Sequence, residues 1–146
     1  FILFIFFIIV YYIKPEQRTS FIFWAMITLL ISDQLGRYFK LLFLRDRPWA
    51  YFELDMIRNL STNLGSNLSF PSNHTANIFG AYIITSIFLP KWKAILLSSS
   101  ILIMFSRVYI GAHFPLDIIG GIIIGYTSGK SLIQIRNYLI RKNIFR

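Results

Sequence analysis

Long apolar segments separated by short polar breaks constrain this chain of 146 residues more than any other feature. Four of them are long enough, at about 1.5 Å per helical residue, to cross or nearly cross a bilayer core of about 30 Å: residues 20–44, 72–89, 92–110 and 116–139. Residues 1–13 are also apolar but too short to span, and we interpret them as the end of a further helix. The sequence therefore predicts an all-α, polytopic transmembrane helix bundle with five helices.

Turn-forming residues separate these segments. They are Pro15, Pro48, Pro90, Gly111 and Pro115. Residues 49–70 are polar and turn-rich, with a short interfacial segment expected at 52–60. We expect a single membrane-embedded domain over 1–146, with its polar motifs within 40–117. Because Phe1 lies inside an apolar run and is not an initiator Met, we expect the N-terminus to be incomplete.

Composition narrows the class of protein. The chain has no cysteine, which excludes disulfides, thiolate metal sites and cysteine catalysis. Its formal net charge is +9, but the Lys and Arg residues flank apolar runs and form no basic helix with polar neighbours. We therefore expect a lipid bilayer, and not nucleic acid, as the partner; the sequence carries no signal for an oligomeric state.

Each membrane crossing reverses the chain, so the ends of successive helices alternate between two faces. One face receives Lys40, Arg47, Ser72, His74, Arg107, His113 and Asp117. The opposite face receives Lys14, Arg18, Lys91, Lys93, Arg136, Arg141, Lys142 and Arg146. The positive-inside rule assigns the second face to the cytoplasm. The polar cluster is then expected to face the periplasm or exterior of a bacterial inner membrane.

The cations of this cluster suit a phosphate group. Lys40, Arg47 and Arg107 supply charge-assisted donors. Ser72 occupies a helix N-cap position, next to backbone amides that have no helical partner. A lone Lys or Arg in such a place is often only a snorkelling anchor. Three cations that converge with two histidines, however, would repel one another without an anion between them.

The histidines supply the reactive groups. His113 and Asp117 are four residues apart, so on a helix the carboxylate would hold one imidazole nitrogen while the other faces a substrate. His113 would attack phosphorus, and His74 would protonate the departing oxygen, through a phosphohistidine. The alternatives are an interfacial role for His74 and a purely structural His113–Asp117 hydrogen bond. No residue spacing indicates a metal site, and we expect no cofactor.

Three motifs, in order, carry a family resemblance. They are Lys40 followed by six residues and Arg47-Pro48; Pro71-Ser72-Asn73-His74; and Ser106-Arg107 followed by five residues, His113, three residues and Asp117. The chain resembles the type 2 phosphatidic acid phosphatase family, which includes vanadium haloperoxidases and glucose-6-phosphatase. The resemblance implies a metal-independent phosphatase with His113 as nucleophile, Asp117 as its orienter and His74 as acid. The phosphate ligands that it implies are Lys40, Arg47, Ser72 and Arg107.

Asn73 departs from the family motif, which has glycine at this position. Glycine would let the backbone approach a phosphate without a side chain in the way. Asparagine tolerates positive φ better than other non-glycine residues, and its amide could donate to phosphate. We therefore count Asn73 among the phosphate-binding residues and expect Asn73→Gly to leave hydrolysis within about tenfold.

Polar and small residues also occur within the spans. Asp33, Arg37 and Lys40 lie at i, i+4 and i+7 on one helix face. We expect a buried Asp33–Arg37 pair that supports Lys40, with a proton relay as the alternative. Glycines at four-residue spacing predict close helix packing: Gly121, Gly125 and Gly129.

An integral membrane lipid phosphatase is the leading hypothesis, because little chain lies outside the bilayer and a substrate's tails would stay in lipid. Arg45 and Arg58 are extra cations near the site; they suggest a second phosphate on the head group, or simply interfacial anchoring. By similarity to small family members we favour lipid A 1-phosphate, with undecaprenyl diphosphate and phosphatidylglycerophosphate as alternatives. A different class also fits: a non-catalytic protein that binds or transports a phospholipid.

Overall fold

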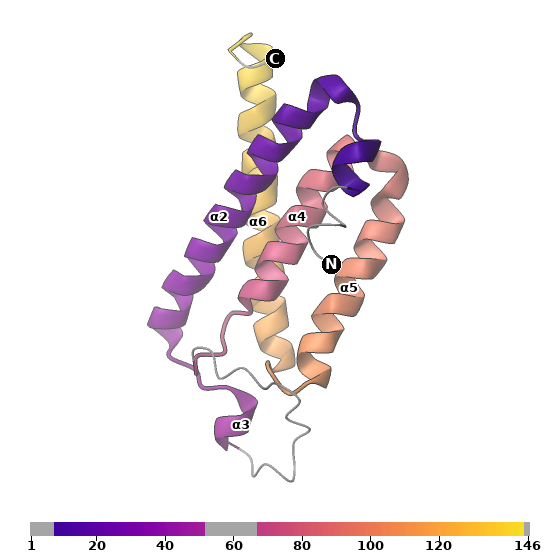
Figure 1. The fold of residues 1–146 in the computed structure, drawn as a ribbon. Coiled ribbons are helices and arrows are strands. Elements are labelled where there is room, and N and C mark those ends of the chain that lie inside the picture. The colour runs from indigo at the N-terminus through magenta and orange to yellow at the C-terminus, as the bar shows by residue number, and fades with distance from the viewer. Residues whose placement is uncertain (1–7, 52–66, 145–146) are drawn as a thin grey trace.

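A computed structural model of the chain describes residues 8–51 and 67–144. Its elements are η1 (Pro15–Gln17), α2 (Arg18–Phe43), α3 (Pro48–Tyr51), α4 (Asn73–Phe88), η2 (Pro90–Trp92), α5 (Lys93–Tyr109) and α6 (Pro115–Arg141). The long helices α2, α4, α5 and α6 run up and down in a bundle, in which α4 contacts the other three (Figure 1). The prediction of an all-helical bundle is confirmed for the described part of the chain.

The described residues contain fewer membrane-crossing helices than the five predicted. Three helical stretches have the length and hydropathy of a span: Pro15–Phe43, Pro90–Tyr109 and Pro115–Arg141. Helix α4 has 16 residues, or about 24 Å, and falls short of that length. Residues 8–12 are helical but too few to confirm a fifth span. The interfacial segment expected at 52–60 lies outside the described residues.

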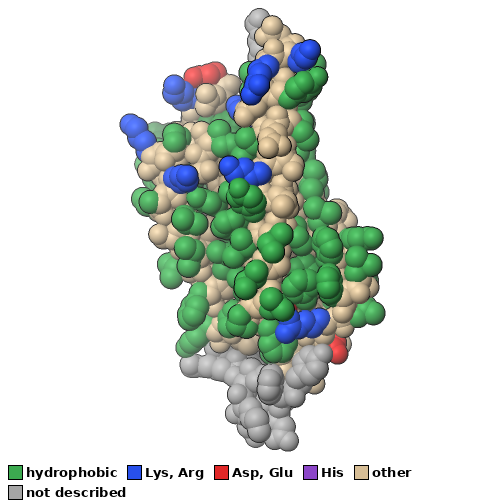
Figure 2. Space-filling view, turned by 180° about the vertical axis from the view of Figure 1, so that it is seen from behind, with side chains coloured by type: hydrophobic (Ala, Val, Ile, Leu, Met, Phe, Trp, Pro, Cys, Tyr) green, Lys and Arg blue, Asp and Glu red, His purple; other side chains and the backbone are tan. Residues whose placement is uncertain are grey.

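Apolar side chains cover the outside of the bundle. Leu30, Leu102 and Ile123, on three different helices, are 60%, 69% and 58% exposed. Figure 2 shows hydrophobic side chains across the middle of one face, with Lys and Arg in its upper third and near its lower end. The interior, in contrast, contains small hydroxyl residues: Thr28, Ser32, Thr85, Ser100 and Ser128. This distribution suits a lipid environment, where packing of small residues replaces the hydrophobic effect.

Helix α6 packs directly on α4 through the three spaced glycines. A Cβ added at Gly125 would lie 2.4 Å from the carbonyl oxygen of Ala76, and one at Gly121 would lie 2.6 Å from that of Ser72. At Gly129 it would lie 2.8 Å from the Ile83 side chain. Only glycine permits so close an approach, so the predicted packing role is confirmed. The contact holds the first turn of α4 against the second turn of α6.

The alternating helix directions separate two ends of the bundle. The end of α2, the start of α4, the end of α5 and the start of α6 lie together at the lower end in Figure 1, which we call the site end. The other termini of these four helices lie at the opposite end, which we call the basic end. The basic end carries Lys14, Arg18, Lys91, Lys93, Arg136, Arg141 and Lys142. Arg146 lies outside the described residues.

Candidate active site

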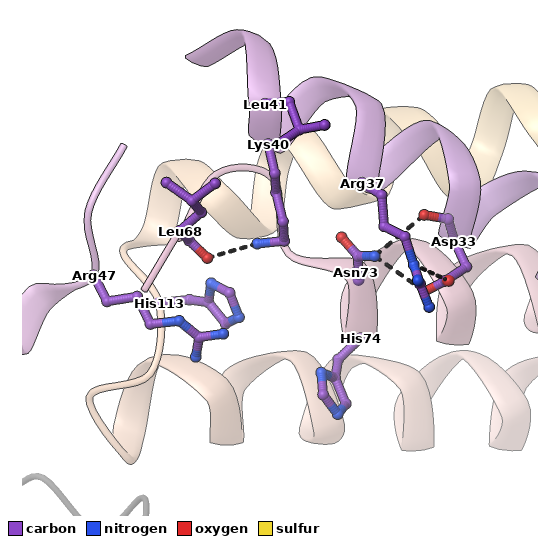
Figure 3. A pocket seen from close by; sticks show the side chains of 9 residues that line it. All are labelled: Asp33, Arg37, Lys40, Leu41, Arg47, Leu68, Asn73, His74 and His113. Atoms are coloured by element: carbon purple, nitrogen blue, oxygen red, sulfur yellow. Dashed lines mark hydrogen bonds and ion pairs between the residues drawn. The ribbon is translucent and has the colours of Figure 1, made fainter. Parts of the chain in front are cut away.

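One pocket of about 450 Å³ at the site end gathers most of the predicted site residues (Figure 3). It is lined by Asp33, Arg37, Lys40, Leu41, Arg47, Leu68, Asn73, His74 and His113. Five separate parts of the chain contribute: α2, the segment at 44–47, the segment at 67–69, the first turn of α4, and the turn between α5 and α6. Seven of the ten predicted residues thus share one cavity, and the other three, Ser72, Arg107 and Asp117, are not part of its lining.

Lys40 joins the end of α2 to the segment that precedes α4. Its Nζ donates to the carbonyl oxygens of Leu68 at 2.8 Å and Ser69 at 3.1 Å. The same segment pairs with the chain after α2, because the Arg47 amide donates to the Asn67 carbonyl at 3.1 Å. An ammonium group has three protons, so one donor of Lys40 remains for a ligand in the pocket.

Two arginines bring buried donors that have no partner among the described residues. The Nε atoms of Arg47 and Arg107 are both buried and both lack a hydrogen bond there. The Arg47 guanidinium lies over the Trp49 ring at 4.9 Å, and burial lowers its pKa. Arg107 is close enough to His74 to repel its charged form. An unpaired buried donor is costly, and an oxyanion in the pocket would give the Nε of Arg47, which lines it, a partner.

Ser72 forms the predicted N-cap of α4 but does not reach the pocket. Its hydroxyl accepts from the Thr75 amide at 3.4 Å and from the Thr75 hydroxyl at 3.1 Å. Its own amide donates to the Asp117 carbonyl at 3.0 Å, and the residue is fully buried. The amides of Asn73 and His74, at the first two helical positions, have no intrahelical acceptor in any α-helix. They, and not the Ser72 hydroxyl, are the groups that α4 can offer to an anion.

Asn73 turns its side chain towards α2. Its Nδ2 donates to Asp33 Oδ1 at 3.0 Å, and Asp33 Oδ2 accepts from Arg37 Nε at 2.7 Å (Figure 3). The amide lies against Gly36, where an added Cβ would be 2.5 Å from Asn73 Oδ1. The predicted Asp33–Arg37 pair is therefore present, but the expectation that it is buried is wrong, because the Arg37 side chain is 67% exposed. The pair was also expected to support Lys40. Asp33 instead accepts a hydrogen bond from Asn73, and Lys40 donates to backbone carbonyl oxygens.

His113 and Asp117 approach each other without lying on one helix. His113 lies in the turn before α6, and its Nδ1 is 3.5 Å from Asp117 Oδ2. Asp117, in the first turn of α6, accepts from the Phe114 amide at 2.8 Å and so caps the helix. The i, i+4 spacing thus correctly predicted that His113 and Asp117 are neighbours, but the expectation that both lie on one helix is wrong. At 3.5 Å, the direct hydrogen bond is a weak one.

Two residues that the sequence analysis did not assign to Asp117 hold its carboxylate. The Ser69 hydroxyl donates to Oδ2 and also lies 3.5 Å from His113 Nδ1, so it sits between the two groups. Arg45 Nη1 lies 3.1 Å from Oδ1, and its guanidinium stacks on the Phe114 ring at 4.3 Å. Arg45 thus pairs with Asp117 through one amino group and does not line the pocket; Arg58 lies outside the described residues.

The two histidines differ in burial. His113 is 3% exposed, and burial lowers its pKa; the hydrogen bond with Asp117 opposes that shift, whereas the Arg47 and Lys40 charges add to it. The imidazole is consequently neutral near pH 7. With Nδ1 towards Ser69 and Asp117, its Nε2 is the nitrogen available to the pocket. His74, the second residue of α4, is exposed and lines the same pocket (Figure 3).

The described helices form a bundle with an apolar surface, and cations and histidines surround one pocket at its end. These features are those of a membrane protein whose pocket suits a phosphate group. Residues 21–141 match the PAP2 superfamily, and the chain belongs to that superfamily. All the predicted site residues lie within the matched range. No solved structure matches the chain.

Several relatives are named for lipid phosphatases. The chain is 35% identical over 142 residues to a lipid A 4'-phosphatase of Porphyromonas gingivalis, covering 94% of this chain and 59% of that protein. It is 29% identical to an undecaprenyl-diphosphatase of Sulfolobus acidocaldarius, covering 77% and 53%. A lipid A 1-phosphatase of Rhizobium johnstonii is 25% identical, with 77% and 48% covered. The chain thus spans about half to three-fifths of the length of these relatives.

Proposed function

We propose that this chain hydrolyses a phosphate from a membrane lipid head group. The observation that carries the proposal is the shared pocket, in which Lys40, Arg47, His74 and His113 meet. The unpartnered buried Nε atom of Arg47, which lines this pocket, supports it, because an oxyanion there would give that donor a partner.

In the proposed reaction, His113 Nε2 attacks phosphorus and the bond to the leaving oxygen breaks. His74 donates a proton to that oxygen, and water then hydrolyses the phosphohistidine to free phosphate. Lys40, Arg47 and Arg107, with the first amides of α4, would stabilise charge on the other phosphate oxygens. Asp117 would hold the Nδ1–H tautomer of His113, so that Nε2 stays free.

The substrate class follows from the environment of the pocket and from the relatives. The surrounding surface is apolar, so a lipid's tails can stay in the bilayer while its head group enters. We favour lipid A phosphates, because relatives named for both the 4'- and the 1-phosphatase match; the sequence analysis had favoured the 1-position. Undecaprenyl diphosphate is the next candidate, on the strength of the Sulfolobus relative, and phosphatidylglycerophosphate follows.

We further propose that the protein resides in a bacterial inner membrane with its site end towards the periplasm or exterior. The described cations of the basic end, Lys14, Arg18, Lys91, Lys93, Arg136, Arg141 and Lys142, support this orientation. The cations of the site itself reduce the difference in positive charge between the two ends of the bundle.

Phosphate release from a lipid panel in detergent tests the activity. We expect one lipid to dominate in kcat/KM, inhibition by vanadate and no inhibition by EDTA. His113→Ala should abolish release while lipid binding persists, since the nucleophile is lost and the cations remain. A parent protein that binds these lipids but releases no phosphate would instead be a binding or transport protein.

A further inference from the structure

The pocket extends well beyond the space that one phosphate needs. Its volume of about 450 Å³ would hold roughly fifteen water molecules at about 30 Å³ each. Lys40, Arg47, His74 and His113 line one part of it. Arg37, with Asp33 and Asn73, lines the rest along α2 (Figure 3). The second part therefore has a cation of its own.

One hydrogen bond orients the Arg37 guanidinium, and its other donors have no hydrogen-bond partner in the described ranges. Its Nε donates to Asp33 Oδ2 at 2.7 Å, and Asn73 Nδ2 occupies Asp33 Oδ1 at 3.0 Å. The Arg37 side chain is nevertheless 67% exposed, and its terminal amino groups have no partner in the described ranges. A guanidinium held through Nε presents those two amino groups side by side, which matches two oxygens of one phosphate.

The position of Arg37 indicates which part of a lipid it would meet. It precedes Lys40 by three residues, so it lies about 4.5 Å further from the site end of α2, towards the middle of the bundle. A lipid tail also points towards the bilayer middle. A group bound at Arg37 would thus lie between the tail and the reactive phosphate, close enough to be joined to it through a single bridging oxygen.

We propose that Arg37, held by Asp33, which in turn accepts from Asn73, binds the tail-proximal phosphate of a lipid diphosphate while the histidine part of the pocket holds the terminal phosphate. This inference rests on the proposed phosphatase function and, among the substrates proposed there, favours undecaprenyl diphosphate over a lipid A phosphate. His113 Nε2 bonds to the terminal phosphorus, and the bond from that phosphorus to the bridging oxygen breaks. His74 protonates that oxygen, and a lipid monophosphate leaves from Arg37.

Binding to a His113→Ala background tests this without turnover. The probes are a prenyl diphosphate and a prenyl monophosphate with the same tail, in detergent. We expect Arg37→Ala to weaken diphosphate binding by about tenfold, as for a charge-assisted hydrogen bond, and to leave monophosphate binding within about twofold. Arg141→Ala, which removes an exposed cation at the basic end, is the matched control and should change neither affinity.

Each other outcome counts against the inference. If Arg37→Ala weakens both lipids equally, or neither, there is no subsite for a second phosphate. If inorganic diphosphate binds as tightly as the prenyl diphosphate, the lipid assignment is wrong. Failure of the phosphatase proposal would look different. The parent protein would then release no phosphate from either lipid, although Arg37→Ala would still weaken diphosphate binding.

Discussion

Gly36 and Asn73 are in contact, so substitutions at the two positions should have coupled effects on activity, and Gly36→Ala tests this. The new Cβ would lie 2.5 Å from Asn73 Oδ1 and 2.9 Å from Cγ, about 1 Å inside a favourable carbon contact. The Asn73 amide must move to make room, which strains its 3.0 Å hydrogen bond to Asp33. Because α4 begins at Asn73, strain there reaches His74 in the same turn.

The cost follows from these contacts. Overpacking a tight site costs about 1–3 kcal/mol, and loss of the bond to Asp33 falls within that range. If all of it appeared in the transition state, hydrolysis would fall by about 5- to 150-fold. The higher helix propensity of alanine works in the opposite direction, by up to about 1 kcal/mol.

The double variant Gly36→Ala/Asn73→Gly provides the decisive comparison. Removing the Asn73 side chain leaves room for the new methyl group, so its activity should return to within about tenfold of the parent. Phosphate release, with thermal unfolding in detergent as a check on folding, measures all four proteins of the cycle. If the double variant is no more active than Gly36→Ala alone, the contact between Gly36 and Asn73 does not matter for the site.

Three further outcomes follow from the geometry of the site. Ser69→Ala should lower kcat by roughly 10- to 150-fold with KM within about threefold, because a hydrogen bond to the buried Asp117 carboxylate is lost, and Ser69→Thr should restore much of it; a change in KM alone would contradict this role. Because burial lowers the pKa of His113, the neutral nucleophile should persist as pH falls, so the acidic limb of the kcat/KM profile should lie below about pH 6.5; an acidic limb above that value would refute the assignment, whereas the basic limb reports the acid His74. The chain lacks cysteine, so Ala50→Cys at the site end should react in intact cells with a membrane-impermeant maleimide and Lys93→Cys at the basic end should not; the reverse labelling would invert the proposed orientation.

Much of this architecture could be predicted from the sequence because lipid imposes simple rules. Apolar length and turn residues fixed α2, α4, α5 and α6 to within a few residues, since a membrane leaves helices as the way to satisfy backbone hydrogen bonds. Counting crossings was enough to bring Lys40, His74 and His113 to one end. The glycine spacing correctly predicted close packing, because a four-residue period marks one helix face.

The count of spans was harder to predict, because hydropathy alone does not tell an enclosed helix from one that faces lipid. Helix α4 is apolar like its neighbours, yet it is shorter and packs against α2, α5 and α6. Its apolar residues face other helices, and the same composition would also suit a lipid-facing span. The described helices supply three candidate spans, and the predicted count of five is not confirmed.

The sequence by itself determined which residue types reach the site end, because that depends only on helix lengths and directions. Tertiary structure alone decided how they are partnered. Arg45 pairs with Asp117, Ser69 lies between Asp117 and His113, and Asn73 donates to Asp33 in the wall of the pocket. The reason is physical: a buried carboxylate or amide takes whichever donor or acceptor the folded chain brings within about 3 Å, and those partners come from segments distant in sequence.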